Sequence, residues 1–291
     1  MSNPTHRVVA VLNCLAQRPG RSLTLSDLAR ETGISKSTLH PLAETLLNSG
    51  YLLRDSDRRL HLGPALTGLG EAALGERGHL VSSLRALMNE IADELNAHCI
   101  LTAQLGEWVV PLAAAGEPSR VTTLFRVGER TQPFAPPLGV LFLFGRSMGE
   151  LQEWLGRAYP EPDSREVDMV MAALELLRSR GVAAAARSGT KALAEGMIFR
   201  ENRKHSETPD PESFQEWMTE LRREQYLIVD FSDPTPREVE WIGTPLLNRA
   251  GRVDLALCAV NFPKPLSGEE VLEIGGYLRT RAASVPGVRL T

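Results

Sequence analysis

The sequence predicts an α+β protein built of two domains, on three observations. At 291 residues the chain is long enough for two domains that each bury a hydrophobic core. Short segments with helical spacing of apolar residues dominate residues 1–75, which we take as the first domain. Strand-like runs and longer helices share residues 79–291, and such a mixture is typical of an α+β sheet domain.

The first domain opens with two helices. Residues 5–16 place apolar side chains at helical spacing, so this helix would pack behind the segment that follows. Thr24 is followed three residues later by Asp27, which predicts an N-cap and a capping box for a second helix. Gly33 ends that helix.

A third helix and a ribbon of two strands complete the first domain. Ser35 opens the helix, whose leucines recur at helical spacing, and Gly50 ends it as a C′ glycine would. Residues 51–53 then predict a strand, residues 55–57 a turn and residues 58–62 the returning strand. Three helices followed by such a ribbon make a winged helix-turn-helix.

Polar side chains of the third helix and of the ribbon tip are candidates for nucleic-acid contact. Lys36 can donate to guanine in the major groove, and hydroxyl groups can reach base edges or phosphate. Arginines at the tip need only charge and reach to contact phosphate. The alternative is a solvated helix N-terminus capped by Ser35, with a charged tip that keeps the ribbon soluble. The candidate DNA-binding residues are Ser35, Lys36, Ser37, Thr38, His40, Arg58 and Arg59.

The charge of the chain is divided unevenly between its parts. Residues 1–63 hold eight Lys and Arg against five Asp and Glu, whereas the whole chain has a formal net charge of −4. The remaining residues therefore carry −7. This mild asymmetry fits a basic module joined to an acidic one.

The second domain begins with an amphipathic helix and a hairpin. Residues 80–95 form the helix, which could also pair with its copy in a dimer. Residues 98–104 and 108–115 read as two strands joined by a tight turn. The prolines and glycine of residues 132–139 force a loop, which leads into an apolar helix at residues 140–144.

The remainder of the chain alternates between helical and strand patterns. Helices are expected at residues 148–157, 164–180, 214–225 and 268–285, and strands at residues 121–125, 182–186, 226–231, 239–247 and 253–261.

Catalytic and metal-binding motifs are missing from the sequence. Cys14, Cys99 and Cys258 are an odd number at wide spacing, so buried thiols are expected in place of disulfides or a zinc site. The sequence has no GxSxG, Walker loop, dinucleotide glycine pattern or HExxH. We therefore expect no enzyme and no cofactor. The N-terminus lacks the features of a signal peptide and no window suits a membrane helix, so a cytoplasmic location is expected.

Four stretches of the chain resemble the IclR family of bacterial transcription regulators. The stretch LTLSDLARETGISKSTLHPLAETLLNSGYL is similar to that family's helix-turn-helix, and RRLHLGPALTGLG is similar to its wing and linker helix. The stretches PFAPPLGV and IGTPLLNRAGRVDLALCAVNFP resemble its effector-binding domain more weakly. The resemblance implies a GAF-like C-terminal domain that senses a small molecule, and a homodimer or homotetramer on a pseudo-palindromic double-stranded DNA operator.

Pro41 departs from the pattern of that family, whose members usually have an arginine directly after the histidine of the recognition helix. A proline there has no N–H for the carbonyl of Ser37, and its cost inside a helix is on the order of 3 kcal/mol. Either the helix is regular only after Pro41, or DNA contacts shift toward its first turn.

The effector site is expected around the loop that ends at Gly139. Free N–H groups where this loop becomes a helix would suit an anion, although the same residues could simply form a packed turn. By position in the resemblance, residues of the last strands would line the same pocket, and for each of them core packing is the alternative. The candidate effector-binding residues are Pro137, Leu138, Gly139, Asp230, Thr244, Ala259 and Asn261.

Two functions follow from these patterns. The first is a DNA-binding transcription regulator that senses a small organic acid. The large apolar residues Leu138, Trp241 and Pro245 near the expected pocket favour an aromatic or hydrophobic acid. The second is a metabolite-binding or enzymatic protein whose winged helix has lost DNA binding and serves protein interaction, and Pro41 supports it.

Overall fold

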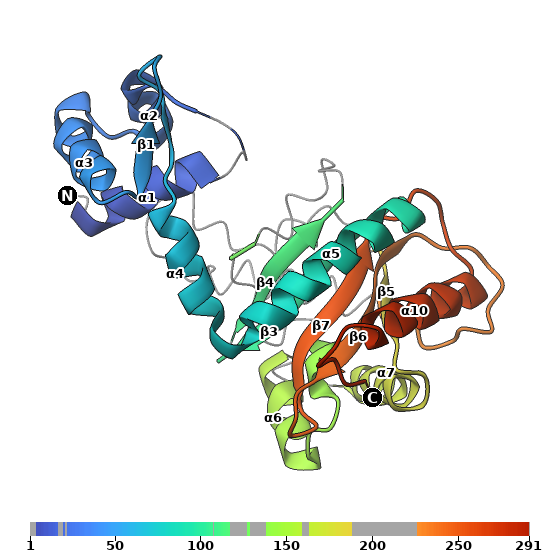
Figure 1. Ribbon diagram of the computed structural model, residues 1–291. Coiled ribbons are helices and arrows are strands. Elements are labelled where there is room, and N and C mark those ends of the chain that lie inside the picture. The colour runs from blue at the N-terminus through green and yellow to red at the C-terminus, as the bar shows by residue number, and fades with distance from the viewer. Residues whose placement is uncertain are drawn as a thin grey trace. The chain divides into compact units, whose positions relative to one another are not determined.

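The computed structural model divides the chain into two compact units, which are considered separately below (Figure 1). The first unit extends to Gly78 and the second begins at His79. The structure describes residues 4–16, 20, 22–106, 108–116, 127–128, 138–158, 163–187 and 226–290.

The N-terminal unit consists of three helices, a two-stranded ribbon and a fourth helix (Figure 1). Its elements are α1 (Pro4–Ala16), α2 (Leu25–Thr32), α3 (Lys36–Asn48), β1 (Leu52–Arg54), β2 (Leu60–Leu62) and α4 (Ala65–Leu74), followed by a 3₁₀ helix at Gly75–Arg77.

The helix ends of this unit are those that the sequence predicts. Thr24 is the N-cap of α2 and forms a capping box with Asp27, and Gly33 ends that helix in the left-handed region at φ 69°. Gly50 takes φ 72° after α3. Its N–H donates to Leu47 O at 3.0 Å, and the next N–H, that of Tyr51, donates to Leu46 O at 2.9 Å. These two bonds are a Schellman motif, which satisfies carbonyls that the helix end leaves open.

The core of the N-terminal unit joins α1 to the helix-turn-helix and the ribbon. Val11, Leu28, Leu39 and Leu52 are fully buried in one cluster, so α1 packs behind the other two helices. Leu60 of β2 also belongs to this cluster, and it forms an additional bridge with the segment before α2. The predicted winged helix-turn-helix is thus formed by one continuous core.

The C-terminal unit is built on a five-stranded antiparallel sheet of order β4-β3-β7-β6-β5. Its strands are β3 (His98–Leu105), β4 (Trp108–Ala115), β5 (Ala183–Ala186), β6 (Val239–Leu247) and β7 (Val253–Val260). Its helices are α5 (Gly78–Leu95), the 3₁₀ helix η3 (Leu138–Leu143), α6 (Met148–Ala158), α7 (Ser164–Arg180) and α10 (Gly268–Ala283). The predicted α+β class is therefore confirmed.

The two faces of the sheet are covered by different helices. On one face η3, α6 and α7 pack against side chains such as Ile100, Trp241 and Cys258. On the other face α10 packs against β6 and β7, and α5 lies beside α10 (Figure 1). Because successive side chains of a strand point to opposite faces, Ile242 and Ala259 belong to the α5–α10 face.

Several predicted elements differ in the structure. The returning strand of the ribbon starts at Leu60 instead of residue 58, because Arg58 takes φ 59° and is part of the turn. The apolar helix at residues 140–144 is the 3₁₀ helix η3. Residues 226–231 form an isolated bridge from Leu227 to Ala185. The predicted elements at 121–125 and 214–225 lie outside the described residues.

Membrane insertion through a helix finds no support in the described part of the chain, where no helix has the length and apolar character that crossing a bilayer requires.

Gly63 provides a test of the packing between α3 and the ribbon. A Cβ at this position would lie 2.1 Å from Gly50 O, so Gly63→Ala forces the two backbone segments apart. We expect a loss of roughly 1–3 kcal/mol in the free energy of unfolding. Gly70→Ala in α4 is the matched control, because its Cβ meets nothing within 4 Å. Thermal and urea unfolding should show the control unchanged or slightly more stable, and equal behaviour of the two variants would contradict this account.

Candidate nucleic-acid interface and ligand face

The recognition helix α3 begins with a group of hydroxyls held by its N-cap. The Oγ of Ser35 lies 3.0 Å from Ser37 Oγ and 2.9 Å from Thr38 Oγ1, and it accepts the N–H of Thr38 at 3.4 Å. Ser35, Lys36, Ser37 and His40 are exposed, whereas Thr38 is half-buried. The structure therefore presents four of the five predicted helix residues to solvent at the first turns of α3.

Pro41 lies on the exposed side of α3, and the helix runs through it without interruption to Asn48. Because Pro41 has no N–H, the carbonyl of Ser37 loses its helical donor. The Pro41 carbonyl accepts the hydroxyl of Thr45 at 3.0 Å. The buried side of the helix carries Leu39 and Ala43. Of the two possibilities that the sequence left open, a helix that is regular only after Pro41 is excluded.

The ribbon tip is organised by Asp55. Its carboxylate accepts the N–H groups of Asp57 at 3.0 Å and of Arg59 at 2.8 Å, and it lies 2.8 Å from Nε2 of His61. The hydrogen bond from His61, together with these backbone donors, lowers the pKa of Asp55. The turn is therefore closed by a carboxylate that stays ionised at neutral pH.

The two arginines of the tip are placed differently. Arg58 is exposed, as expected of a residue that contacts phosphate. Arg59 is half-buried, and its guanidinium donates to the hydroxyl of Ser22 at 2.9 Å and to the Ser22 carbonyl at 3.0 Å. The expectation that both arginines extend from the tip thus holds in the structure for Arg58, whereas Arg59 ties the ribbon to the segment before α2.

An ion pair that the sequence did not single out joins the ribbon to α3. Arg54 Nη2 donates to Glu44 Oε1 at 2.7 Å, and the two side chains are 40% and 41% exposed. Strand alternation puts Arg54 on the side of β1 that carries Leu52, which faces the core. This alternation was visible in the sequence, but the partner of Arg54 depends on how the ribbon packs against α3.

The candidate effector residues do not form one site in the structure. Leu138 and Gly139 belong to η3, whereas Thr244 and Ala259 are fully buried and face α5 and α10 on the opposite side of the sheet. The physical reason is the alternation of side chains along β6 and β7. The structure thus places these residues on opposite sides of the sheet, and their assignment to one effector pocket stays a prediction. Pro137 lies outside the described residues.

Asp230 and Asn261 lie at chain turns. Asp230 is exposed and accepts the N–H and the hydroxyl of Ser232, at 2.8 and 2.6 Å. The hydroxyl of Ser232 is the largest cause that lowers the pKa of Asp230. Asn261 follows β7 in the left-handed region at φ 68°. Asp230 thus closes a local turn, whereas Asn261 directly follows the end of β7.

Trp241 lies on the face of the sheet that η3 covers. From the sequence it was used only as a large apolar residue near the expected pocket and was not predicted to be a hydrogen-bond donor. It is fully buried on the face covered by η3, and its indole N–H has no hydrogen-bond partner among the described residues. Gly243 follows on the same face, where a Cβ would lie 2.9 Å from Leu141 Cδ1. A buried donor without a partner among the described residues is costly in free energy, which singles out the Trp241 N–H.

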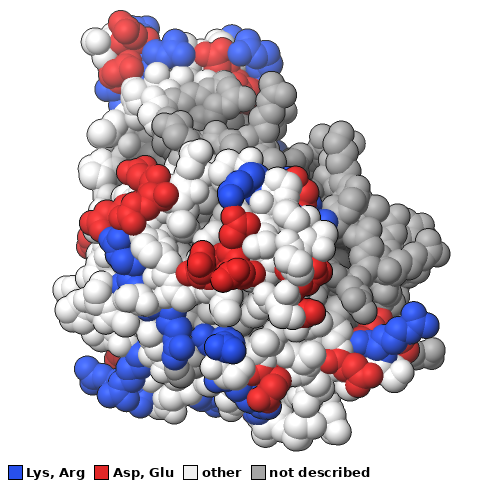
Figure 2. All heavy atoms as spheres, turned by 90° about the vertical axis from the view of Figure 1, so that its right-hand side faces the viewer, with Lys and Arg blue, Asp and Glu red and all other residues white. Residues whose placement is uncertain are grey.

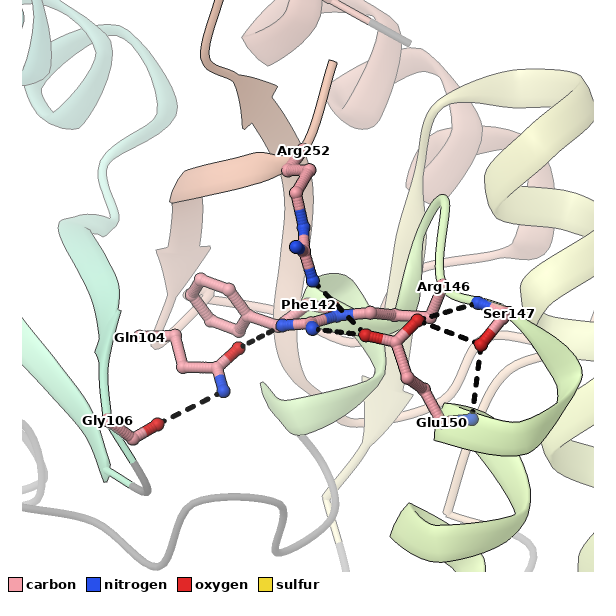
Figure 3. A network of polar contacts seen from close by, with 7 residues as sticks. All are labelled: Gln104, Gly106, Phe142, Arg146, Ser147, Glu150 and Arg252. Carbon is pink, nitrogen blue, oxygen red and sulfur yellow. Dashed lines mark hydrogen bonds and ion pairs between the residues drawn. The ribbon is translucent and has the colours of Figure 1, made fainter. Parts of the chain in front are cut away.

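A polar network fixes the end of η3 to its surroundings (Figure 3). Arg146 donates to the Phe142 carbonyl at 3.3 Å, to Gln104 Oε1 at 3.0 Å and to Glu150 Oε1 at 2.8 Å. Arg252, from the turn before β7, adds a second guanidinium at 3.1 Å from Glu150 Oε1. The N–H of Ser147 and the guanidinium of Arg146 lower the pKa of Glu150 to about 2. One arginine thereby connects η3, β3 and α6.

Catalytic and metal chemistry finds no support in the described residues. Cys14, Cys99 and Cys258 are free, buried thiols, as expected, and burial raises the pKa of Cys99 to about 12. A thiol of this kind is not a ready nucleophile. The described ranges contain no group of three or more His, Cys, Asp or Glu that could hold a metal ion.

Comparison with known sequences places the N-terminal unit in a family. Residues 5–56 match the family model of the IclR helix-turn-helix domain. A curated relative, the HTH-type transcriptional regulator KipR of Bacillus subtilis (strain 168), is 26% identical over 138 residues, which are 46% of this chain and 54% of that protein. The match thus spans about half the length of the curated relative.

Solved structures with the same fold cover nearly the whole chain. The Thermotoga maritima IclR has a TM-score of 0.58 at 16% identity, over 96% of this chain and 95% of the other. An IclR transcriptional regulator from Alicyclobacillus acidocaldarius has 0.54 at 20%, over 97% of both chains. An IclR homolog from Microbacterium hydrocarbonoxydans, solved in complex with 4-hydroxybenzoate, has 0.53 at 21%, over 97% and 96%. These likenesses show that the chain has the fold of these structures, and the family match shows that residues 5–56 are similar to the IclR helix-turn-helix domain.

Glu150 gives the C-terminal unit a pH dependence. Its folded pKa of about 2 lies below the ordinary 4.5, so its contribution to stability is present above pH 4.5 and is lost as the pH falls toward 2. We expect Glu150→Gln to lower the unfolding midpoint at neutral pH and to flatten its decline in that window. Asp168→Asn, which removes an exposed carboxylate of α7, is the control. Melting curves across the pH range would refute this if the two variants lost stability in parallel.

Proposed function

We propose that this chain, whose N-terminal unit carries an IclR helix-turn-helix domain, is a transcription regulator that binds double-stranded operator DNA and responds to a small organic acid. The observation that carries this proposal is the match of residues 5–56 together with the exposed polar face of α3. A curated relative that is itself a transcriptional regulator supports it. The absence of catalytic motifs from the sequence supports a role without enzymatic activity.

DNA is read by the first turns of α3 in this proposal. Lys36 supplies a cation for guanine or phosphate, and the hydroxyls of Ser35, Ser37 and Thr38 serve base edges. The imidazole of His40 follows on the same exposed face. Arg58 at the ribbon tip contacts the phosphate backbone, whereas Arg59 acts by holding the ribbon to Ser22.

The effector is proposed to bind on the face of the sheet that η3 covers. Trp241 supplies a buried N–H for one oxygen of a carboxylate, and the aromatic ring of Phe142 lies in the same cluster. A neighbour in fold is solved with 4-hydroxybenzoate, which is an aromatic acid. These observations favour an aromatic or hydrophobic acid over a short polar one.

A homodimer or homotetramer in the cytoplasm completes the proposal. Two copies of the winged helix match the two halves of a pseudo-palindromic operator. The helix α4 has no buried residue within the chain, and Leu69 is 53% exposed. Pairing of α4 with its copy would give this helix the cover that the described part of one chain does not give, whereas α5 already buries Leu84, Met88 and Ile91 within the chain.

The second candidate function is a metabolite-binding protein whose winged helix serves protein interaction. Pro41 favours it, because it occupies the exposed side of α3 with an uncharged ring. Figure 2 shows one other face of the molecule, on which acidic and basic side chains lie in small groups. The two functions differ in one measurable property, namely specific DNA binding.

DNA binding is tested by mobility shift with the duplex upstream of the protein's own coding region. We expect tighter binding to this duplex than to a random one, and for Arg58→Ala a uniform loss with a salt slope reduced by about one. Pro41→Arg should add affinity to a parent that already binds. A parent that does not distinguish the two duplexes, with a large gain in Pro41→Arg, would favour the second function.

Effector binding is tested by calorimetry with 4-hydroxybenzoate and a panel of short carboxylic acids. We expect Trp241→Phe, which removes the N–H and keeps an aromatic ring, to weaken binding of the aromatic acid roughly 10-fold. Thr244→Val, which removes a buried hydroxyl from the opposite face of the sheet, should leave it unchanged. Loss of binding in Thr244→Val alone would move the site to the α5–α10 face.

A further inference from the structure

We propose that Arg54 contacts the DNA phosphate backbone and that Glu44 is a positioning residue that holds it at the recognition helix. This inference rests on the proposed DNA-binding function and extends it to a residue of the ribbon strand. It is carried by the ion pair between β1 and α3, by the exposure of both side chains, and by the distribution of charge around α3.

The backbone of the ribbon directs Arg54 toward α3. Leu52, two residues earlier on β1, is fully buried and belongs to the core cluster that contains Leu39 of α3. Side chains at alternate positions of a strand share a face, so Arg54 leaves the ribbon on the same side, beyond the edge of the core. There it meets Glu44 with its Nη2 at 2.7 Å from Oε1.

The guanidinium of Arg54 keeps most of its donors available. An arginine has five N–H donors in a fixed fork, and the described residues take one of them, through Glu44. Arg59, by contrast, spends two donors on Ser22. The bond to Glu44 already restricts the side chain of Arg54. Binding of a phosphate by the remaining N–H donors therefore costs less side-chain entropy.

The charge of Glu44 on α3 gives a reason why DNA binding would require the Arg54–Glu44 ion pair. Lys36 and Glu44 are the Lys, Arg, Asp and Glu residues of α3, with Lys36 exposed at its first residue and Glu44 half-buried in its C-terminal half. An unpaired Glu44 carboxylate would repel DNA phosphates. Paired with Arg54 it is neutralised, and the guanidinium provides a fixed cation near the end of α3 that is remote from Lys36. An exposed pair adds little to stability, so its loss can be studied in a folded protein.

The test is a fluorescence-anisotropy titration of the full chain with labelled upstream duplex and with random duplex across a salt series. We expect Arg54→Ala to weaken binding to both duplexes roughly 10-fold and to reduce the salt slope by about one. Arg54→Lys, which keeps the charge but not the fork, should retain the slope and lose part of the affinity. Arg30→Ala is the matched control, because Arg30 is an exposed arginine paired with Asp27 on α2.

Glu44→Gln distinguishes positioning from simple repulsion. It removes a negative charge, so Coulomb repulsion alone predicts tighter DNA binding, whereas the positioning role predicts binding about 3-fold weaker. Tighter binding in Glu44→Gln, or equal losses in Arg54→Ala and Arg30→Ala, would overturn the inference while wild-type DNA binding persists. A wild type that does not distinguish the duplexes would overturn the proposed function first. Melting midpoints close to that of the wild type confirm that each variant is folded.

Discussion

The structure of the N-terminal unit depends on the close backbone contact at the end of α3. Gly50 turns the chain into the left-handed region, and its carbonyl accepts the N–H of Ala65 at 3.2 Å, while Gly63 N donates to Tyr51 O at 2.8 Å. The backbone of Gly63 lies so close to Gly50 that no side chain fits between them. This contact fixes the ribbon and the start of α4 to the recognition helix. The backbone positions of Arg54 and Arg58 relative to α3 depend on these contacts, and side-chain bonds to Glu44 and within the turn at Asp55 then place the ion pair and the tip.

In the C-terminal unit the corresponding constraint is the pleat of β6 and β7. Trp241 and Gly243 of β6 face η3. Thr244, the next residue of β6, points to the opposite face of the sheet, which α5 and α10 cover. A ligand on one face therefore does not contact residues that face the other, however close they are in sequence. The network of Arg146 then holds η3 at the edge of its face by bonds to β3 and α6. One face of the sheet therefore packs against α5 and α10. The other face, which η3 covers, is the one on which we propose that the ligand binds.

Local signals made much of this fold predictable. The capping box at Thr24, the αL glycines 33 and 50, and the apolar strand pattern of residues 239–247 each specify an element through nearby residues, and the structure has them where the sequence predicts. What could not be predicted depends on packing between elements. The bond of Arg59 to Ser22 and the pairing of Arg54 with Glu44 join residues that are distant in sequence. The effector residues were assigned by position in a resemblance, which ignores the face to which each side chain points, and the strand pairing places Thr244 and Ala259 on the face opposite to that of Trp241.

Pro41 has a further consequence for how this helix meets DNA. Because Pro41 donates no N–H, the main-chain oxygen of Ser37 lacks the i+4 donor of a regular helix, and water can hydrate it on the exposed side of α3. If α3 enters the major groove of DNA, the carbonyl of Ser37 must either keep a water molecule that bridges to the DNA or accept a hydrogen bond from the amino group of a base. Recognition by this helix would then include a main-chain acceptor. Such an acceptor persists whatever side chain replaces Ser37, so truncating the side chains of α3 one by one would not reveal it.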